Sequence, residues 1–179
     1  MTKTNAAAVD FFGQDPINIT ESSKGTFYQD VAHRSSGKDD WQTPPDLFEK
    51  LNKHFNFECD VAANHENRLC NSYFTAEHSC LGNSSWSAMN FMNPPYGREI
   101  IHFVEKAYQQ YTDKGNATVA LLPARTGTKW FHEYVYNKAD ILFLKGRLYF
   151  HDSEGRLPNA APFESMLVAW GTDFSRLQL

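Results

Sequence analysis

The sequence predicts an α/β fold with a mostly parallel sheet, an antiparallel end and helices on both faces. One observation is that short apolar runs alternate with stretches of helical period, a pattern typical of parallel sheets. A second is the uninterrupted apolar run at 117–123, which indicates a strand buried on both faces. A third is the closing group of strands after residue 139, which favours antiparallel pairing at one end.

Length and composition favour one globular domain. The chain has 179 residues, of which 41% are hydrophobic, and this is enough for a single core. No apolar run is long enough to span a bilayer, and residues 1–10 hold one lysine but no apolar core of a secretory signal. Cys59, Cys70 and Cys80 are odd in number and lack metal-site spacing. We therefore expect free thiols, no metal and a cytoplasmic location.

The composition changes near residue 40. Residues 1–39 are rich in Ser, Thr, Asn, Asp and Gly, with only scattered apolar positions, and they predict a flexible N-terminal arm. Residues 40–179 carry the periodic segments and are predicted to form one domain.

The first element of this domain is a helix that begins at residue 43 or 44. Thr43 can cap it with Pro44 in the first helical position, and apolar residues follow at helical spacing. The exposed N–H groups of a helix start suit a ligand carboxylate. Equally, Thr43 can be a plain cap with Trp41 packed in the core, and the residues alone leave both interpretations open.

Two short strands follow. Residues 57–63 form the first strand and its exit, where Asp60 precedes small residues such as Ala62. Asp60 can pair with a ligand cation or cap a following helix. Residues 73–74 suggest a second strand. Glu77 stands 17 positions after Asp60, near the spacing at which a carboxylate contacts ribose hydroxyls in Rossmann-like folds.

The most informative stretch is Asn93-Pro94-Pro95-Tyr96-Gly97, which follows a short apolar run and precedes apolar positions of helical period. It is predicted on a strand-to-helix loop, where open α/β sheets bind ligands. The prolines stiffen the loop and leave its carbonyls able to accept, and the Asn93 amide oxygen is a further acceptor. Two fixed acceptors can hold an –NH2 group, and Tyr96 offers a flat face to a planar base. The pattern predicts methyl transfer to an exocyclic amine; an ordinary turn is the alternative.

The remaining segments complete the predicted sheet. We expect a helix at 98–112, a strand at 117–123, a helix at 129–137, and strands at 141–144, 146–150 and 164–170. Arg125 follows the buried strand at the sheet edge, where it can contact phosphate, frame a base pocket or form a salt bridge. Residues 151–163 contain Gly155, Pro158 and Pro162 and predict a loop.

Several stretches together resemble the phage-type DNA N6-adenine methyltransferases (Dam-like). The motif Asn93-Pro94-Pro95-Tyr96 is similar to the catalytic motif of amino-methyltransferases that use S-adenosylmethionine. The other stretches, in family order between residues 40 and 170, are Trp41-Gln42-Thr43-Pro44, Asp60-Val61-Ala62-Ala63, Tyr73-Phe74-Thr75, Pro123-Ala124-Arg125-Thr126 and Gly146-Arg147-Leu148-Tyr149-Phe150. The resemblance implies a Rossmann-like methyltransferase sheet, S-adenosylmethionine as cofactor, double-stranded DNA as partner and no metal.

The resemblance also implies roles for individual residues. It assigns catalysis to residues 93–96, cofactor binding to Trp41, Thr43, Pro44, Asp60, Ala62 and Glu77, and substrate binding to Arg125, Arg147, Phe150 and Phe163. Ala62 stands where the wider superfamily has glycine. A flipped adenine would stack on Tyr96, with Phe150 or Phe163 on its second face; core packing is the alternative for both phenylalanines.

The charge is unevenly distributed along the chain. The net charge of −4 divides into −5 for residues 1–90 and +1 for residues 91–179. Six basic residues fall near the predicted site: Arg98, Arg125, Lys129, Lys145, Arg147 and Arg156. They predict a local positive rim for phosphates and weak, salt-sensitive DNA binding, with solvated surface charge as the alternative.

DNA adenine-N6 methylation is the leading hypothesis, and two alternatives remain beside it. The same four motif residues occur in enzymes that methylate cytosine N4, RNA adenine or protein glutamine. The second alternative is a catalytically dead DNA-binding phage protein, which the scarcity of glycine in the first loop favours. Only a short tail follows residue 170, so we expect sequence recognition to come from residues 151–163, the arm or a partner.

Overall fold

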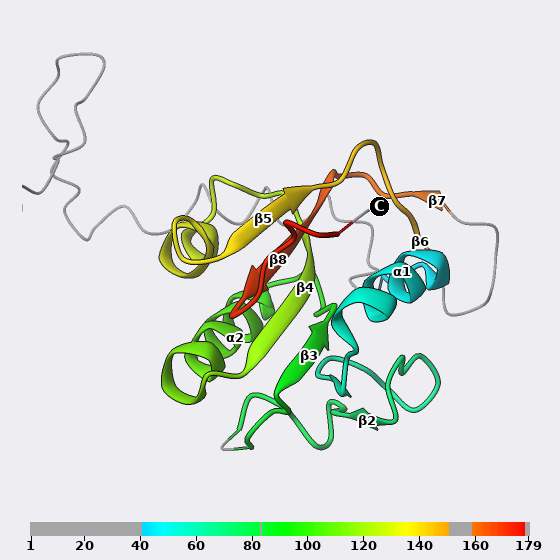
Figure 1. Ribbon diagram of the computed structural model, residues 1–179. Coiled ribbons are helices and arrows are strands. Elements are labelled where there is room, and N and C mark those ends of the chain that lie inside the picture. The colour runs from blue at the N-terminus through cyan, green and yellow to red at the C-terminus, as the bar shows by residue number, and fades with distance from the viewer. Residues whose placement is uncertain (1–40, 83, 151–158, 178–179) are drawn as a thin grey trace, which may run out of the picture. The chain divides into compact units, whose positions relative to one another are not determined.

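A six-stranded mixed sheet forms the centre of the computed structural model, which describes residues 41–82, 84–150 and 159–177 (Figure 1). These residues all belong to the unit Lys38–Leu179. The strand order is β2-β1-β3-β4-β8-β5. The bounds are β1 Cys59–Asp60, β2 Ser72–Tyr73, β3 Met89–Met92, β4 Ala117–Pro123, β5 Asp140–Phe143 and β8 Ser165–Trp170. Strands β1 to β4 pair in parallel, and β8 pairs antiparallel with both β4 and β5, which confirms the mostly parallel sheet with an antiparallel end.

The two faces of the sheet carry different helices. The register places Phe91 and Ala169 on one face and Trp170 on the other, because successive side chains of a strand alternate. The Phe91 ring lies 5.2 Å from that of Phe48 in α1 (Pro45–Phe55). On the opposite face, the Trp170 indole Nε1 donates to the Tyr134 carbonyl (2.8 Å) in η3 (Phe131–Val135). Helix α2 (Ile100–Lys114) packs beside η3, so helices cover both faces (Figure 1).

Helix α1 forms as its apolar spacing predicts but begins slightly later. Its buried residues are Leu47, Phe48, Leu51 and Phe55. Pro44 occupies the N-cap position, Pro45 begins the helix, and no side chain caps it. The prediction that Thr43 caps this helix is therefore wrong, and its hydroxyl is engaged elsewhere. The helix ends at Asn56, which adopts a left-handed conformation (φ 54°) and donates its N–H to the Asn52 carbonyl.

Three connections differ from the sequence prediction. Within the described residues, turns rather than a helix join β1 to β2, so Asp60 does not cap a following helix. The predicted strand at 146–150 shortens to β6 (Tyr149–Phe150), which leaves the main sheet and pairs with β7 (Asn159–Ala160). In place of the α-helix predicted at 129–137, the five residues of η3 form a π-helical segment.

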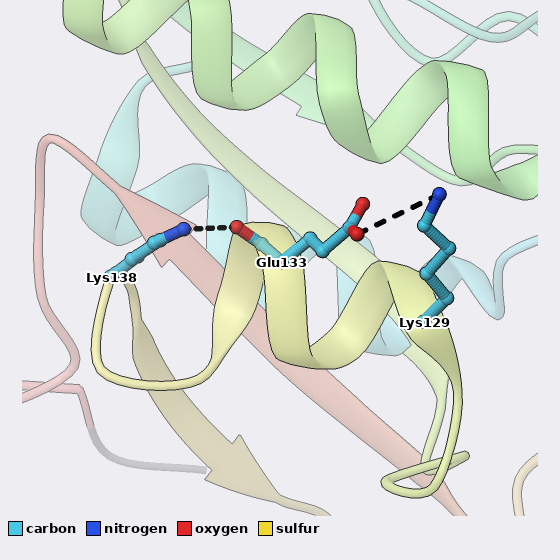
Figure 2. Close-up of polar contacts among 3 residues, drawn as sticks. All are labelled: Lys129, Glu133 and Lys138. Carbon is cyan, nitrogen blue, oxygen red and sulfur yellow. Dashed lines mark hydrogen bonds and ion pairs between the residues drawn. The ribbon is translucent and has the colours of Figure 1, made fainter. Parts of the chain in front are cut away.

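A small polar cluster supports η3. The Lys129 ammonium lies 3.6 Å from the Glu133 carboxylate, and the Lys138 ammonium donates to the Glu133 carbonyl (Figure 2). Lys138 also lies over the Tyr108 ring of α2, 5.2 Å from its centroid. These contacts tie η3 to α2. They also leave Lys129 paired, although the sequence placed it among the residues of a positive rim.

The topology creates a switch point between β1 and β3. From β1 the chain moves to β2 on one side and then to β3 on the other. The loops that leave β1 and β3 at their carboxyl ends therefore diverge, and the space between them is where open α/β sheets bind ligands. None of the helices in the described ranges has the length and apolar content to cross a bilayer.

Candidate active site

A cavity of about 460 Å³ opens at the carboxyl ends of β1, β2 and β3. Its walls are residues 41–43 before α1, the loop after β1, the loop after β2 and residues 93–95 after β3. Its volume lies within the range of small-molecule sites, roughly 300–1,000 Å³. The cavity therefore coincides with the switch point of the sheet.

Asn93 is held in one orientation at this cavity. Its amide Nδ2 donates to the Trp41 carbonyl (2.6 Å) and to Thr43 Oγ1 (2.9 Å). Its Oδ1 is buried and has no hydrogen-bond partner among the described residues. An unsatisfied buried acceptor costs roughly 1–3 kcal/mol, so it is suited to a donor that a ligand brings.

The two prolines place a second acceptor next to Asn93. Both Pro94 and Pro95 line the cavity, Pro94 buried and Pro95 exposed. The Pro94 carbonyl accepts no backbone hydrogen bond within the described ranges. Neither proline has an N–H of its own to satisfy, and the fixed φ of each limits movement of the corner.

Tyr96 faces the core. Only 2% of its surface is exposed, and it does not line the cavity. Its hydroxyl donates to the Leu121 carbonyl of β4 (3.2 Å), and burial raises the pKa of this hydroxyl well above its usual value. The edge of the Phe163 ring lies against it, with centroids 5.4 Å apart. A base that stacks on Tyr96 would have to displace side chains that now cover the ring.

Arg125 braces the same corner from the loop after β4. Its guanidinium donates to the Tyr96 carbonyl (3.0 Å) and lies 5.9 Å from the Phe163 ring centroid. Phe163 in turn meets the Trp41 ring edge-on at 5.5 Å. Arg125 forms no ion pair with the part of the chain that is described. Of the three predicted possibilities, the geometry supports a framing role over a salt bridge.

Asp60 supplies a buried carboxylate to the cavity. It is 3% exposed, and its two oxygens accept from the backbone N–H groups of Ala62 (3.3 Å) and Leu69 (3.2 Å). Loss of hydration raises the pKa of Asp60 to about 6, and the two hydrogen bonds offset part of this increase. A buried carboxylate with a raised pKa attracts a cationic group, because a nearby positive charge favours its ionised form.

The structure brings Glu66, rather than Glu77, to the cavity. Both carboxylates are exposed, but only Glu66 lines the cavity. The reason is the turn at 64–67, in which Asn64 Oδ1 accepts from the N–H groups of Glu66 and Asn67. Sequence reasoning missed Glu66 because the expected spacing assumes a helix between the first two strands. The run of turn-forming residues around it was the available signal.

The other predicted residues are spread more widely. Trp41, Thr43 and Ala62 line the cavity, whereas Pro44 is buried behind them. Arg147 pairs with Glu164 (3.8 Å) on the surface. Phe150 lies in β6, and its side chain, Arg156 with residues 151–158, and the arm 1–39 lie outside the described residues.

Two further chemical groups bear on the site. The three cysteines are free thiols; burial raises the pKa of Cys59 to about 11 and those of Cys70 and Cys80 to about 12. They are therefore protonated and poorly nucleophilic at neutral pH. The described ranges contain no cluster of three His, Cys, Asp or Glu side chains that could hold a metal ion.

Comparison with known proteins gives consistent results. A family model described as DNA N-6-adenine-methyltransferase (Dam) matches residues 31–175. The DNA N-6-adenine-methyltransferase of Escherichia phage T1 is 33% identical over 128 residues, which cover 69% of this chain and 52% of that protein. The enzyme of the same name from Haemophilus phage HP1 (strain HP1c1) is 31% identical over 113 residues, or 62% of this chain and 65% of that protein. The chain thus spans between about half and two thirds of these curated relatives.

Proposed function

Because the chain belongs to the DNA N-6-adenine-methyltransferase (Dam) family, we propose that it methylates the N6 amine of adenine in double-stranded DNA, with S-adenosylmethionine as methyl donor. The names of both phage relatives support this substrate. We further propose that residues 40–179 are a methyltransferase domain of Rossmann-like type and that residues 1–39 are an appended arm.

The observation that carries the proposal is the buried, unpartnered Oδ1 of Asn93 at the wall of the cavity. The next residue, Pro94, lines the same cavity, and its carbonyl is likewise unengaged within the described backbone. Two acceptors match the two hydrogens of an exocyclic amine, whereas a hydroxyl or a ring N–H could satisfy only one of them. A dead fold would have no reason to keep this acceptor unsatisfied at a cost in stability.

The residues of the corner act on the amine directly. The adenine must leave the duplex, since its amine is paired inside the helix. Asn93 Oδ1 and the Pro94 carbonyl would then accept the two N6 hydrogens and turn the nitrogen lone pair outward. As the new C–N bond forms, positive charge grows on N6, and the two acceptors stabilise it. The N6 proton afterwards leaves to water, and no covalent bond to the enzyme is required.

The cavity residues fit a sulfonium cofactor with an amino-acid end and a nucleoside end. When bound, this cofactor would supply an electrophilic methyl carbon and would keep the electron pair of the broken sulfur–carbon bond as a neutral thioether. Asp60 would pair with its ammonium; burial raises the pKa of this carboxyl, and a neighbouring cation would favour its ionised form. Thr43, Trp41 and the small Ala62 would shape the methionine side, and Glu66 would take the ribose role that the sequence gave to Glu77.

The aromatic group around the motif would receive the base. Stacking on Tyr96 stays our prediction, and it requires that Phe163 move from its edge-on position, 5.4 Å away, to the second face of the base. Arg125 would hold the corner in place while this happens, through its bond to the Tyr96 carbonyl.

The test is label transfer from tritiated S-adenosylmethionine to separate samples of DNA, RNA and protein, followed by hydrolysis and chromatography. We expect label in DNA alone, eluting as N6-methyl-2′-deoxyadenosine. Label in N4-methylcytosine, in RNA or in glutamine would change the proposed substrate, while methyl transfer to an amine would still stand. Absence of label in every polymer, together with absence of cofactor binding by calorimetry, would favour a dead fold.

A further inference from the structure

We propose that residues 41–43 are a positioning element for the Asn93 amide, with Thr43 as its side-chain member, and that this element is the reason why an amide rather than a carboxylate stands at position 93. The inference rests on the proposed function, since it concerns the same site. It goes beyond a cofactor role for Thr43, because it gives that residue a part in the chemistry.

The contacts that hold Asn93 come from a distant part of the chain. Its Nδ2 carries two hydrogens, and each has one acceptor: the Trp41 carbonyl, 52 positions earlier, and Thr43 Oγ1, 50 positions earlier. A terminal amide rotates in a broad and roughly two-fold potential, so nothing intrinsic to asparagine selects one orientation. The selection must come from these two partners.

The Trp41 carbonyl decides the orientation. It can only accept, and it lies 2.6 Å from Nδ2. If the amide rotated by half a turn, Oδ1 would stand against this carbonyl with no hydrogen between two acceptors. The rotated form is therefore disfavoured, and Oδ1 remains directed away from residue 41.

Thr43 secures the second hydrogen. A hydroxyl can accept or donate, so Thr43 alone would tolerate both orientations of the amide. Its contribution is to accept the remaining Nδ2 hydrogen, with Oγ1 2.9 Å from Nδ2. Thr43 is only 8% exposed, so water does not readily take its place. Thr43 Oγ1 donates no hydrogen bond to the described residues, so its hydrogen can serve a cofactor group in the cavity.

A carboxylate at position 93 would meet the same carbonyl differently. In the ionised form of an Asn93→Asp variant, one carboxylate oxygen faces the Trp41 carbonyl and repels it. Once protonated, the carboxyl can donate to that carbonyl and present its second oxygen to the cavity, as the amide does. The side chain then regains the donor towards Trp41 and the acceptor towards the cavity, although not the second hydrogen that Thr43 accepts.

The first experiment is the pH profile of Asn93→Asp relative to the unchanged protein at saturating cofactor. We expect the ratio of their kcat values to rise by up to about tenfold per unit as the pH falls from 9 towards 5, because one proton restores the contact. The ratio cancels the titration of groups that both proteins share, Asp60 included. A ratio that stays constant across this range would overturn the proposal.

The second experiment compares Thr43→Val with Thr43→Ser. We expect kcat to fall about tenfold for the valine variant, which leaves a buried N–H unpaired, and by less than about threefold for serine, which keeps the hydroxyl. Affinity for S-adenosylhomocysteine, measured by calorimetry, separates this effect from cofactor binding. Equal kcat values for the two variants would contradict a positioning role.

A third readout needs no activity. The side-chain amide signals of Asn93 in a 15N-labelled protein are identified by their loss in Asn93→Asp. We expect one of the two hydrogens to shift upfield and exchange faster in Thr43→Val than in Thr43→Ser. Unmoved signals would refute the contact even if the protein methylated DNA, and moved signals would sustain it even if the unchanged protein labelled no polymer.

Discussion

Asp60 and Asn93 end neighbouring strands and face the same cavity, yet they are held in opposite ways. The two Asp60 oxygens are bonded by backbone groups two and nine residues further along, within its own loop. The Asn93 amide is bonded by residues 41 and 43, and its oxygen is left over. Asp60 is thus hydrogen-bonded by its own loop and carries a charge. Asn93 is held by residues far away in the sequence and keeps one acceptor without a hydrogen bond.

The difference separates binding from chemistry. The Asp60 carboxylate is held by the backbone of its own loop, so its orientation does not depend on the segment before α1. The Asn93 oxygen is aimed only when that segment is in place. We therefore expect changes at the first site to act on affinity and changes at the second to act on turnover.

The largest expected effect is at Asn93. Asn93→Ala removes the acceptor that stabilises the growing charge on N6, and we expect kcat to fall about 10²–10³-fold, as for loss of one such polar group in other active sites. Affinity for S-adenosylhomocysteine should stay within about twofold, since the neighbouring charge at Asp60 is untouched. Tritiated-methyl incorporation into DNA measures the first quantity and calorimetry the second.

A matched control for this variant is Asn71→Ala, since Asn71 is exposed and does not line the cavity. It should leave both quantities unchanged. Full methylation by Asn93→Ala would remove Asn93 from the mechanism.

A smaller effect is expected at Asp60, and it concerns cofactor affinity rather than kcat. Asp60→Asn removes the charge that faces the cofactor ammonium, so the Kd for S-adenosylhomocysteine should rise about 10–100-fold, the value of one or two charge-assisted hydrogen bonds. For the unchanged protein, affinity should fall about tenfold per unit below pH 6, where Asp60 becomes protonated. In Asp60→Asn this pH dependence should disappear.

The folding stability of the unliganded protein should depend on pH in the opposite direction to cofactor affinity. The folded-state pKa of Asp60, about 6, lies above its ordinary value of 3.8, so the folded form holds the proton more tightly. This group therefore favours folding below about pH 4 and costs up to about 3 kcal/mol of unfolding free energy once the pH passes 6. Urea titrations at pH 4.5 and 7 would measure the change; a stability that rises with pH in the unchanged protein relative to Asp60→Asn would contradict it.

Two variants can decide whether Glu66 or Glu77 contacts the cofactor ribose. Glu66→Gln should weaken S-adenosylhomocysteine binding about fivefold through loss of one partly exposed charge-assisted contact. Glu77→Gln is the matched control, because Glu77 is exposed outside the cavity, and it should change nothing. The reverse result would restore the role that sequence spacing assigned to Glu77.

The sequence predicted features that depend on local pattern. Helix α1 and strands β4 and β8 follow from apolar spacing, and the position of Asn93 after a strand followed from the motif and its flanks. A strand-to-helix loop in a parallel sheet must emerge at the carboxyl edge, so a cavity beside Asn93 could be expected without coordinates.

The features it could not predict depend on distant partners. Thr43 has the sequence of a helix cap, and nothing near it in the chain indicates that its hydroxyl accepts from a residue 50 positions away. Tyr96 belongs to a motif that suggests stacking, but its burial follows from contact with β4 and Phe163. The role of Glu66 depends on a turn that replaces the expected helix after Asp60.

Arg125 tests whether the motif is braced from the far side. Arg125→Ala removes the bond to the Tyr96 carbonyl, so kcat should fall about fivefold, in line with one partly buried hydrogen bond, while KM for DNA stays unchanged. Arg125→Lys should recover little, since a lysine cannot reproduce the planar fork. If Arg125 contacts phosphate instead, KM should rise and the salt dependence of DNA binding should lose about one unit of slope.

The smallest effect is expected at Arg147, where the surface pair with Glu164 complicates a DNA role. The two side chains are 54% and 68% exposed and 3.8 Å apart, so Arg147→Ala should change the unfolding free energy by less than about 0.5 kcal/mol. If Arg147 meets a phosphate, Arg147→Ala should weaken DNA binding about twofold, and Glu164→Gln should strengthen it slightly by releasing the guanidinium. Filter binding at two salt concentrations measures both variants. Opposite signs support a DNA contact at this edge, whereas two null results would confine Arg147 to its surface pair and leave DNA binding to residues nearer the motif.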